Sequence, residues 1–235
     1  PAMRKSEVTR RQLTLQRLLR ISQALEAYHQ KNSVYPAAKV PIGSSNVAVS
    51  WRVQLLPILG LGQLYSQYRI SEPWDSPANR QVLAQIPDVY QSPERQDEKT
   101  NFQLITGSGT VYPSPTQIVE DHDLRDGAGA TVFLAEVGDH LACPWTKPDD
   151  YAFDPARVQH DFFSLRRDCC FVVLGKGIGP RRLSAAIRDA DLLALLSPNG
   201  GERISVETVA EFPRPDVDEA LIEQLAKSPP TRFAP

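Results

Sequence analysis

The sequence lacks the features that mark several large classes of protein. It has no basic excess, since 26 lysines and arginines stand against 28 acidic residues and the formal charge is −2. Proteins that bind a phosphate backbone usually carry such an excess or a basic stripe, so nucleic acid is not an expected partner. No stretch approaches the roughly 18 to 20 consecutive apolar residues of a membrane-spanning helix, and the first residues lack the apolar core of a signal peptide. We therefore expect the chain as given to be soluble.

Methionine is almost absent, and its one occurrence bears on where the natural protein begins. Met3 follows Pro1 and Ala2, and this start resembles the remnant of a cleaved expression tag joined to the protein. We expect the natural chain to continue upstream of residue 4. A membrane contact is expected only through such an upstream segment.

Cysteine and glycine are also scarce. The three cysteines, Cys143, Cys169 and Cys170, cannot all pair within one chain, and adjacent cysteines rarely bridge each other. Three free thiols are the favoured interpretation, and a disulfide from Cys143 to one of the pair is the alternative. No Cys/His cluster has metal-ligand spacing, so no metal is expected. The 20 prolines outnumber the 13 glycines, which indicates ordered turns and irregular connections.

The first half of the chain has helical patterns. Apolar residues at three- and four-residue steps predict one long amphipathic helix over residues 6–31, with Ser6 as its N-cap. Residues 50–68 predict two short helical pieces around a kink at Pro57. A further short helix is expected over residues 78–85, with Ser76 as N-cap and Pro77 as the first helical residue.

The second half changes to short β-rich runs bounded by Gly, Pro and Asp. Strands are expected in FQLITGSGTVYP (102–113), ATVFLAEVG (130–138) and CCFVVLGKGIG (169–179). The leucine spacing predicts a helix over residues 181–196 and a terminal helix over residues 217–227. This order of elements predicts an α+β fold, with a long N-terminal helix packed on a sheet.

Six segments stand out as distinctive phrases of the sequence: LLRISQALEAYHQKNSVYP (18–36), SWRVQLLPIL (50–59), EPWDSPANR (72–80), LRDGAGATVFLAEV (124–137), CPWTKPDD (143–150) and LLALLSPNGGE (192–202). Together they resemble a large paralogous family of unknown function from planctomycetes, whose members commonly start with a prepilin-type segment. The resemblance implies a pilin-like plan, in which the N-terminal helix lies against an antiparallel sheet with loop and short-helix insertions. It also implies a cell-envelope location, with a membrane anchor in the full-length protein.

One motif of that family is altered here. The family carries a His-x9-Asp-Gly motif near its last strand, whereas His160 is followed only much later by Lys176-Gly177 at the place of Asp-Gly. An ammonium in place of a carboxylate reverses the charge, so no metal or proton role of that motif is carried over.

The tryptophan-containing loops hold the candidate binding residues. In EPWDSPANR we interpret Trp74 as a loop anchor that plugs the core, with Asp75 holding backbone donors near the following helix start. The alternative is a ligand site, because Trp beside acids, amides and arginine also suits the faces of sugars. The candidate ligand-binding residues are Trp74, Asp75, Asn79, Arg80 and Trp145.

Other conspicuous residues are interpreted as structural. His29 is expected near the end of the first helix, where the helix dipole favours its charge. The acids of EDHDLRDG (120–127) fail the calcium-loop pattern and predict a solvated turn, with a weak cation site as the alternative. GKGIGPRR (175–182) lacks the phosphate-loop order and predicts a β-turn before the 181–196 helix; its two arginines are candidates for a partner surface.

No Ser-His-Asp, His-Glu-x-x-His or Gly-x-Ser-x-Gly pattern links the four histidines, so no catalytic residue and no cofactor are expected. The predicted organisation is a pilin-like domain over residues 4–212 followed by a helix and tail over residues 213–235. The predicted function is a non-enzymatic pilin-like or pseudopilin-like structural or assembly domain, with protein partners or self-assembly through the first helix. A soluble extracytoplasmic module that binds a small molecule or glycan is the alternative.

Overall fold

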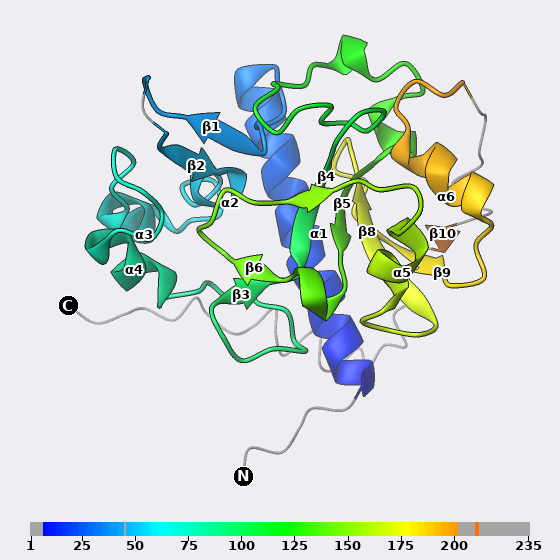
Figure 1. Cartoon of the computed structure of the whole chain (residues 1–235), viewed down its shortest axis with the longest axis horizontal. Helices are drawn as coiled ribbons and strands as arrows, with labels where there is room; N and C mark the ends of the chain where they lie inside the picture. The colour runs from blue at the N-terminus through cyan, green and yellow to red at the C-terminus, as the bar shows by residue number, and fades with distance from the viewer. Residues whose placement is uncertain (1–6, 45, 202–209, 212–235) are drawn as a thin grey trace.

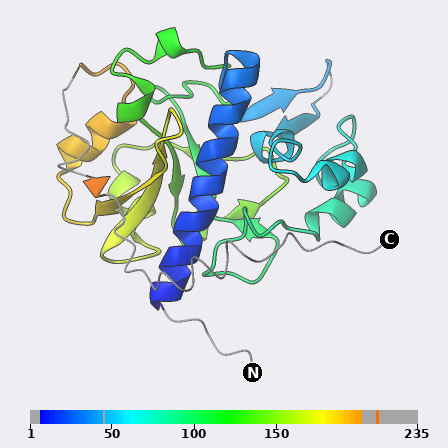
Figure 2. The same ribbon diagram turned by 180° about the vertical axis from the view of Figure 1, so that it is seen from behind.

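The computed structural model of this chain describes residues 7–44, 46–201 and 210–211. Its central feature is a six-stranded sheet covered on both faces. Helix α1 (Glu7–Asn32) lies along one face, and helices α5 (Val158–Phe163) and α6 (Asp189–Leu196) lie on the other (Figures 1 and 2). The predicted α+β class with a long N-terminal helix on a sheet is confirmed.

Helix α1 forms as predicted from the apolar spacing. Its buried residues, among them Leu18, Ile21 and Leu25, recur at steps of three and four and face strands of the sheet. The helix ends at Asn32 because Ser33 adopts a left-handed conformation with φ of 62°. The expected N-cap Ser6 lies outside the described residues.

The large sheet has the strand order β10-β9-β8-β5-β4-β7. Its strands are β4 (Phe102–Thr106), β5 (Val132–Glu136), β7 (Tyr151–Ala152), β8 (Cys169–Leu174), β9 (Pro180–Ser184) and β10 (Ala210–Glu211). The predicted antiparallel pairing is confirmed except that β7 runs parallel to β4. Strand β5 ends at Glu136, which pairs with Phe102 at the start of β4. The chain therefore leaves β5 at the end of the sheet where β4 begins, and from there β7 runs in the same direction as β4.

The position of β8 between two cores explains why its sequence, CCFVVL, is apolar throughout. Cys169, Phe171 and Val173 contribute to the core beneath α1, whereas Cys170 and Val172 belong to the core beneath α5 and α6. A strand with both faces covered needs apolar residues at every position. All three cysteines are buried and free, which confirms the favoured thiol interpretation.

Strand β5 contains a β-bulge that reverses this alternation. Val132 pairs with Leu174 and Leu134 pairs with Val173, so a step of two residues along β5 corresponds to a step of one residue along β8. As a result the neighbours Phe133 and Leu134 both face the α1 side of the sheet.

The helix predicted over residues 181–196 is wrong in its first half. Residues 180–184 form strand β9, which pairs with β8, and helix α6 begins only at Asp189. In β9 the buried Arg181 and Leu183 alternate with half-buried Arg182 and Ser184, which is a strand period. The spacing of Leu183 and Ile187 imitated a helix because the strand and the following turn happen to place apolar residues four apart.

The remaining elements of the described chain are short. They are strands β1 (Lys39–Pro41), β2 (Ala48–Ser50), β3 (Lys99–Thr100) and β6 (Cys143–Pro144), helices α2 (Trp51–Gln54), α3 (Gly62–Gln67) and α4 (Pro77–Leu83), and 3-10 turns η1 (Asp121–Asp123), η2 (Ala128–Ala130) and η3 (Asp139–Leu141). The two short helices predicted within 50–68 and the helix predicted near 78–85 are confirmed. The helix predicted over 217–227 lies outside the described residues.

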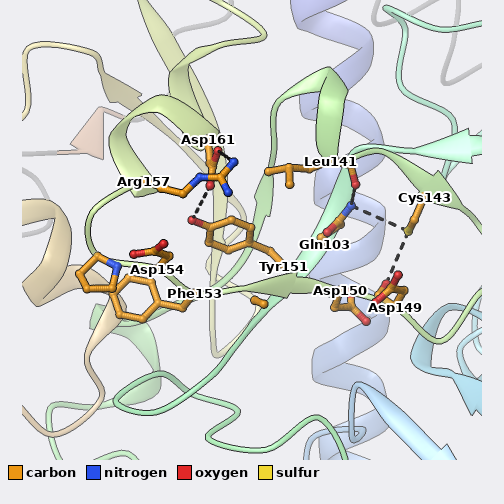
Figure 3. A pocket seen from close by; sticks show the side chains of 12 residues that line it. Gln103, Leu141, Cys143, Asp149, Asp150, Tyr151, Phe153, Asp154, Arg157 and Asp161 are labelled. Carbon is orange, nitrogen blue, oxygen red and sulfur yellow. Dashed lines mark hydrogen bonds and ion pairs between the residues drawn. The ribbon is translucent and has the colours of Figure 1, made fainter.

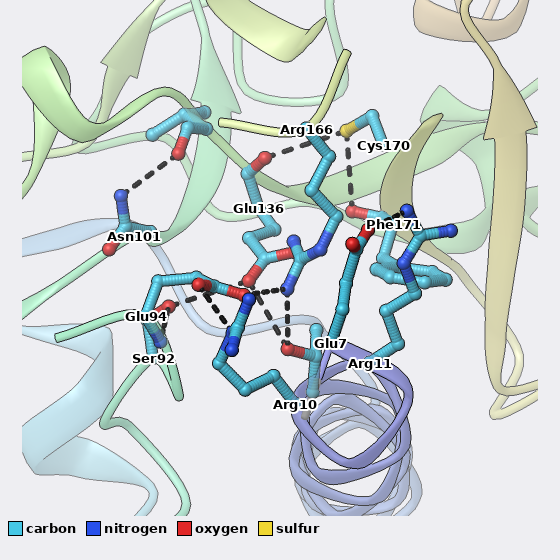
Figure 4. Close-up of polar contacts among 12 residues, drawn as sticks. Glu7, Arg10, Arg11, Ser92, Glu94, Asn101, Glu136, Arg166, Cys170 and Phe171 are labelled. Atoms are coloured by element: carbon cyan, nitrogen blue, oxygen red, sulfur yellow. Dashed lines mark hydrogen bonds and ion pairs between the residues drawn. The ribbon is translucent and has the colours of Figure 1, made fainter. Parts of the chain in front are cut away.

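A buried polar network fastens α1 to the sheet (Figure 4). Arg166 forms an ion pair with Glu136 at the end of β5 and lies 3.1 Å from both the Thr14 hydroxyl and the Glu94 carboxylate. Arg10 of α1 contacts the same Glu94 at 2.8 Å. Burial raises the pKa of Glu136, and the neighbouring guanidinium opposes that rise. The network fixes the position of the helix along the sheet as well as its rotation.

Among the described residues, no helix combines the length and the apolar character needed to cross a membrane. Helix α1 has the length but carries charged residues along its outer face.

Candidate functional site

Asn79, one of the candidate ligand residues, organises the loop that contains it. Its side chain is buried, accepts a hydrogen bond from the Arg69 backbone N–H at 2.8 Å and donates to the carbonyl oxygens of Pro73 at 2.8 Å and Arg69 at 3.0 Å. Ser76 caps α4 as predicted, with its hydroxyl accepting from the Asn79 N–H at 3.2 Å. These contacts hold the loop in place.

Trp74 and Asp75 occupy different positions from those expected. Trp74 is half-buried rather than a plug of the core, and Asp75 is exposed. The loop's buried anchor is Asn79, because an amide can bond to several backbone groups at once whereas an indole has a single donor. The prediction of a core-filling Trp74 is therefore wrong. Asp75 was expected to hold backbone donors near the helix start, and the Asn79 and Arg69 N–H groups are instead bound by Ser76 and Asn79.

Trp145 and Trp51 are fully buried anchors, as the structural interpretation expected. The Trp145 indole N–H donates to the Leu83 carbonyl at 2.9 Å, and its ring stacks on Tyr90 with centroids 5.8 Å apart. Arg80 is exposed on α4. Asn79, Arg80 and Trp145 do not line the cavity to which Trp74 belongs.

A cavity of about 350 Å³ brings Trp74 and Asp75 together with residues from distant parts of the chain. Lys39 of β1 and the pair Lys147 and Asp149, whose charged atoms are 2.8 Å apart, also line it. An aromatic surface with both signs of charge around it suits a polar organic ligand. Of the predicted binding residues, only Trp74 and Asp75 share this cavity.

A larger cavity of about 570 Å³ lies along β7, at the edge of the large sheet (Figure 3). Figure 3 shows Tyr151, Arg157 and Asp161 gathered at one end and Gln103 with Cys143 at the other. Two of its lining acids, Asp150 and Asp161, have side chains that are only 3% and 4% exposed. Sequence reasoning did not identify this cavity.

Three potential metal-ligating residues, His140, His160 and Asp161, lie together where Asp161 lines one end of the larger cavity. One ligand atom each from His140, His160 and Asp161 lies within 4.8 Å of the others. His140 Nε2 is 3.0 Å from Asp161 Oδ1, and the two imidazole centroids are 5.3 Å apart. The Tyr151 hydroxyl donates to Asp161 Oδ2 at 3.1 Å. Burial, together with the nearby Asp161 charge, raises the pKa of Tyr151, which keeps this phenol protonated as a donor.

The sequence offered only a weak signal for this group. His140 is supplied by η3 and His160 with Asp161 by α5, and only the fold brings them together. The one local sign is a pair of mirrored dipeptides, Asp139-His140 and His160-Asp161, about twenty residues apart. Such a pattern has no fixed ligand spacing, which is why it was not identified as a site.

A buried charge pair explains two of the segments that carried the family resemblance. Arg52, from SWRVQLLPIL, forms an ion pair with Asp150, from CPWTKPDD, at 2.8 Å, and both side chains are almost fully buried. Asp150 Oδ1 also accepts from the Trp51 indole at 2.9 Å and from the Leu104 N–H at 2.9 Å. Burial raises the pKa of Asp150 to about 6, although Arg52 opposes the rise.

The aspartates of 120–127 point to separate partners. Asp121 lies 3.4 Å from His29, Asp123 accepts from the Glu120 N–H at 2.9 Å, and Asp126 accepts from the Gly201 N–H at 3.2 Å. This arrangement agrees with the predicted solvated turn. His29 lies in the last turn of α1 as expected, and its ring also stacks on Tyr35 with centroids 4.3 Å apart.

The turn in GKGIGPRR joins two strands rather than leading into a helix. Lys176 and Gly177 adopt left-handed conformations there, and the Lys176 N–H donates to the Tyr35 hydroxyl at 3.3 Å. Arg181 is buried and donates to the Ile178 and Pro180 carbonyls, while Arg182 pairs with Asp168 at 3.2 Å. The suggestion that both arginines serve a partner surface is therefore wrong for Arg181.

Comparison with known proteins extends the sequence resemblance in part. Residues 6–121 match the model of a family described as "Protein of unknown function (DUF1559)". No curated protein and no solved structure gives a significant match. The matched region runs from α1 past β4 and includes three of the resembling segments, at 18–36, 50–59 and 72–80. Over residues 6–121, this chain is thus similar to a family whose function is not established.

Proposed function

We propose that the chain is a pilin-like or pseudopilin-like structural domain of a cell-envelope protein, which assembles with protein partners through α1. The observation that carries the proposal is the placement of this 26-residue helix, which lies along one face of the sheet, while no other described element covers its opposite face (Figure 2). In Figure 2 the first turns of α1 extend past the strands. A helix placed in this way can continue into an assembly segment without any change in the domain.

Two further features support this proposal. The buried network of Arg166, Glu136 and Thr14 gives α1 a fixed rotation, which a helix that transmits assembly contacts requires. The outer face of α1 exposes apolar side chains, with Leu19 41% and Val8 56% exposed. The resemblance to a planctomycete family with a prepilin-type start agrees with the same role.

The gene upstream of residue 4, together with the N-terminus of the mature protein from its source, tests the proposal. We expect a short basic leader, a processing site and then an apolar segment continuous with α1. An unrelated domain in front of α1 would remove the basis for assembly through this helix.

Binding of a small molecule or glycan is the second candidate, because Trp74 is half-buried in a cavity with Asp75 and Lys147. Trp51 and Trp145 are fully buried, so a ligand in this cavity would change the emission of Trp74 alone. We expect a shift in tryptophan fluorescence with one class of a glycan and metabolite panel, and its loss in Trp74→Phe. A flat response across the panel would reject this candidate.

A further inference from the structure

We propose that His140, His160 and Asp161 bind a divalent transition-metal ion, with Zn²⁺ as the reference case, at the place where Asp161 borders the cavity along β7. Their three ligand atoms lie within 4.8 Å of one another although they come from two separate elements, η3 and α5. The inference stands independently of the assembly role proposed for α1.

The backbone holds the two ligand-bearing segments together. The Gly138 N–H donates to the Asp161 carbonyl at 2.7 Å, which ties the start of η3 to α5. A Cβ atom at residue 138 would meet the Ser164 hydroxyl at 2.1 Å and the His140 ring at 2.8 Å. A side chain at residue 138 would require Ser164 and His140 to move, so glycine suits the close placement of His140 against α5.

Asp161 is arranged as a metal-binding carboxylate with an outer-shell partner. It is only 4% exposed, and its Oδ2 accepts from Tyr151 while Oδ1 faces His140. Outer-shell hydrogen bonds of this kind orient a ligand and leave its other oxygen for the ion. The two histidines, by contrast, are exposed and can rotate toward an arriving ion.

The ligand set favours a particular class of ion. Two imidazoles and one carboxylate suit Zn²⁺, Co²⁺ and related ions better than Ca²⁺ or Mg²⁺, which prefer oxygen ligands. Tetrahedral Zn²⁺ with metal–ligand distances of about 2.0–2.2 Å needs ligand atoms about 3.3 Å apart. The 3.0 Å between His140 Nε2 and Asp161 Oδ1 is close to this value, so His160 has the main adjustment to make. Three protein ligands leave a fourth position for water or a small anion.

The positive charge of Arg157 opposes the binding of a cation by His140, His160 and Asp161. Its Nη2 lies 3.7 Å from Asp161 Oδ1, and the side chain is 58% exposed (Figure 3). Asp154, which also lines the cavity, adds negative charge nearby, whereas Asp139 is already paired with Arg95. An ion must displace the Arg157 side chain toward solvent, which its exposure allows. Neutralising Arg157 should therefore strengthen binding.

The test is titration of the untagged protein with Co²⁺ and Zn²⁺ alone, at about pH 7.5, where imidazole is mostly neutral. We expect one ion per chain. Bound Co²⁺ should give a visible absorption that reports nitrogen ligands, and this absorption should disappear when Zn²⁺ displaces Co²⁺. His140→Ala and His160→Ala should each weaken binding at least about 10-fold, because each removes a direct ligand. Arg157→Gln should tighten it several-fold. Both histidines are exposed, so these variants are expected to fold, and circular dichroism checks this.

His122→Ala is the matched control, because His122 is an exposed histidine beside two acids, Glu120 and Asp123, in another part of the molecule. This variant should bind the ion as the parent protein does. Absence of binding in the parent, unchanged affinity in both His140→Ala and His160→Ala, or loss of binding in His122→Ala would each overturn the proposal.

Discussion

At the residue scale, the buried pair of Arg52 and Asp150 is the most consequential contact outside the candidate metal group. Arg52 also donates to the Phe102 carbonyl at 2.9 Å, so one guanidinium joins α2, β4 and the segment before β7. A buried charge pair contributes little net stability compared with apolar residues, but it is costly to break on one side. Its role is to define which segments meet.

We predict that Arg52→Met destabilises the protein by about 3–5 kcal/mol, because Asp150 is left as an uncompensated buried charge. Arg188→Met is the matched control, since Arg188 is 80% exposed and pairs with Asp191 at the surface. That variant should leave the stability nearly unchanged, because exposed ion pairs contribute little. Chemical denaturation measures both, and an equal loss in the two variants would contradict the buried-pair account.

We also predict that the Asp150 carboxyl titrates near pH 6, against an ordinary value of 3.8. Between these two values the folded state binds more protons than the unfolded state at this position. The contribution of Asp150 to the free energy of unfolding is therefore present below about pH 4 and is lost as the pH rises through 6.

Carboxyl carbon NMR across this range measures the titration directly. Asp168 is an internal reference of opposite sign, because its hydrogen bond with Arg11 lowers its pKa to about 2. The stabilisation from Asp168 is present above about pH 4 and is lost as the pH falls toward 2. A midpoint for Asp150 near 4 would show that burial does not govern this group.

At the scale of elements, α1 owes its place to one apolar stripe and one polar network. Leu18 and Ile21 have no exposed surface and pack in the core between the helix and the sheet. Most of the helix's stability should therefore come from this packing rather than from its intrinsic propensity.

We predict that Leu18→Ala costs about 2–5 kcal/mol, because it removes buried methyl groups and leaves a cavity. Leu19→Ala makes the same chemical change on the next residue, which is 41% exposed, and should cost much less. Thermal or urea denaturation compares the two variants. Equal losses would mean that the helix does not present the face assigned to it.

The sequence was sufficient to predict elements whose partners are local or periodic. The 3.6-residue stripe of α1 and the all-apolar run of β8 carried their own signals, and both were predicted. Strand β9 was mistaken for a helix because its strand character comes from pairing with β8, which is remote in sequence. The burial of Arg181 and the β-bulge in β5 likewise depend on tertiary neighbours.

Dependence on contacts between residues that are remote in the sequence also limited the prediction of the candidate sites. Trp74 and Asp75 were identified because an aromatic residue beside an acid is visible in one segment, but Lys39 and Lys147 join them only in the fold. His140 and Asp161 approach through the contact of η3 with α5, which no local pattern encodes. Arg52 and Asp150 lie in two of the segments that carry the resemblance, but no sequence pattern indicates that they pair.

At the scale of the whole molecule, α1, the large sheet and the pair of helices α5 and α6 form three layers, with α1 outermost on one side (Figures 1 and 2). The cavity that Asp161 lines lies at the β7 edge of the sheet, whereas the outer face of α1 lies on the opposite side of the sheet from α5. Assembly through the helix and binding at the cavity can therefore coexist.

Site-specific photo-crosslinking of the full-length protein in its source cells tests the assembly account most directly. A crosslinker at Leu19, on the outer face of α1, is compared with one at Arg80, which is exposed on α4. The account predicts covalent adducts, with a second copy or a fixed protein partner, from Leu19 and none from Arg80. Monomer alone from both positions, or the same adducts from both, would contradict it.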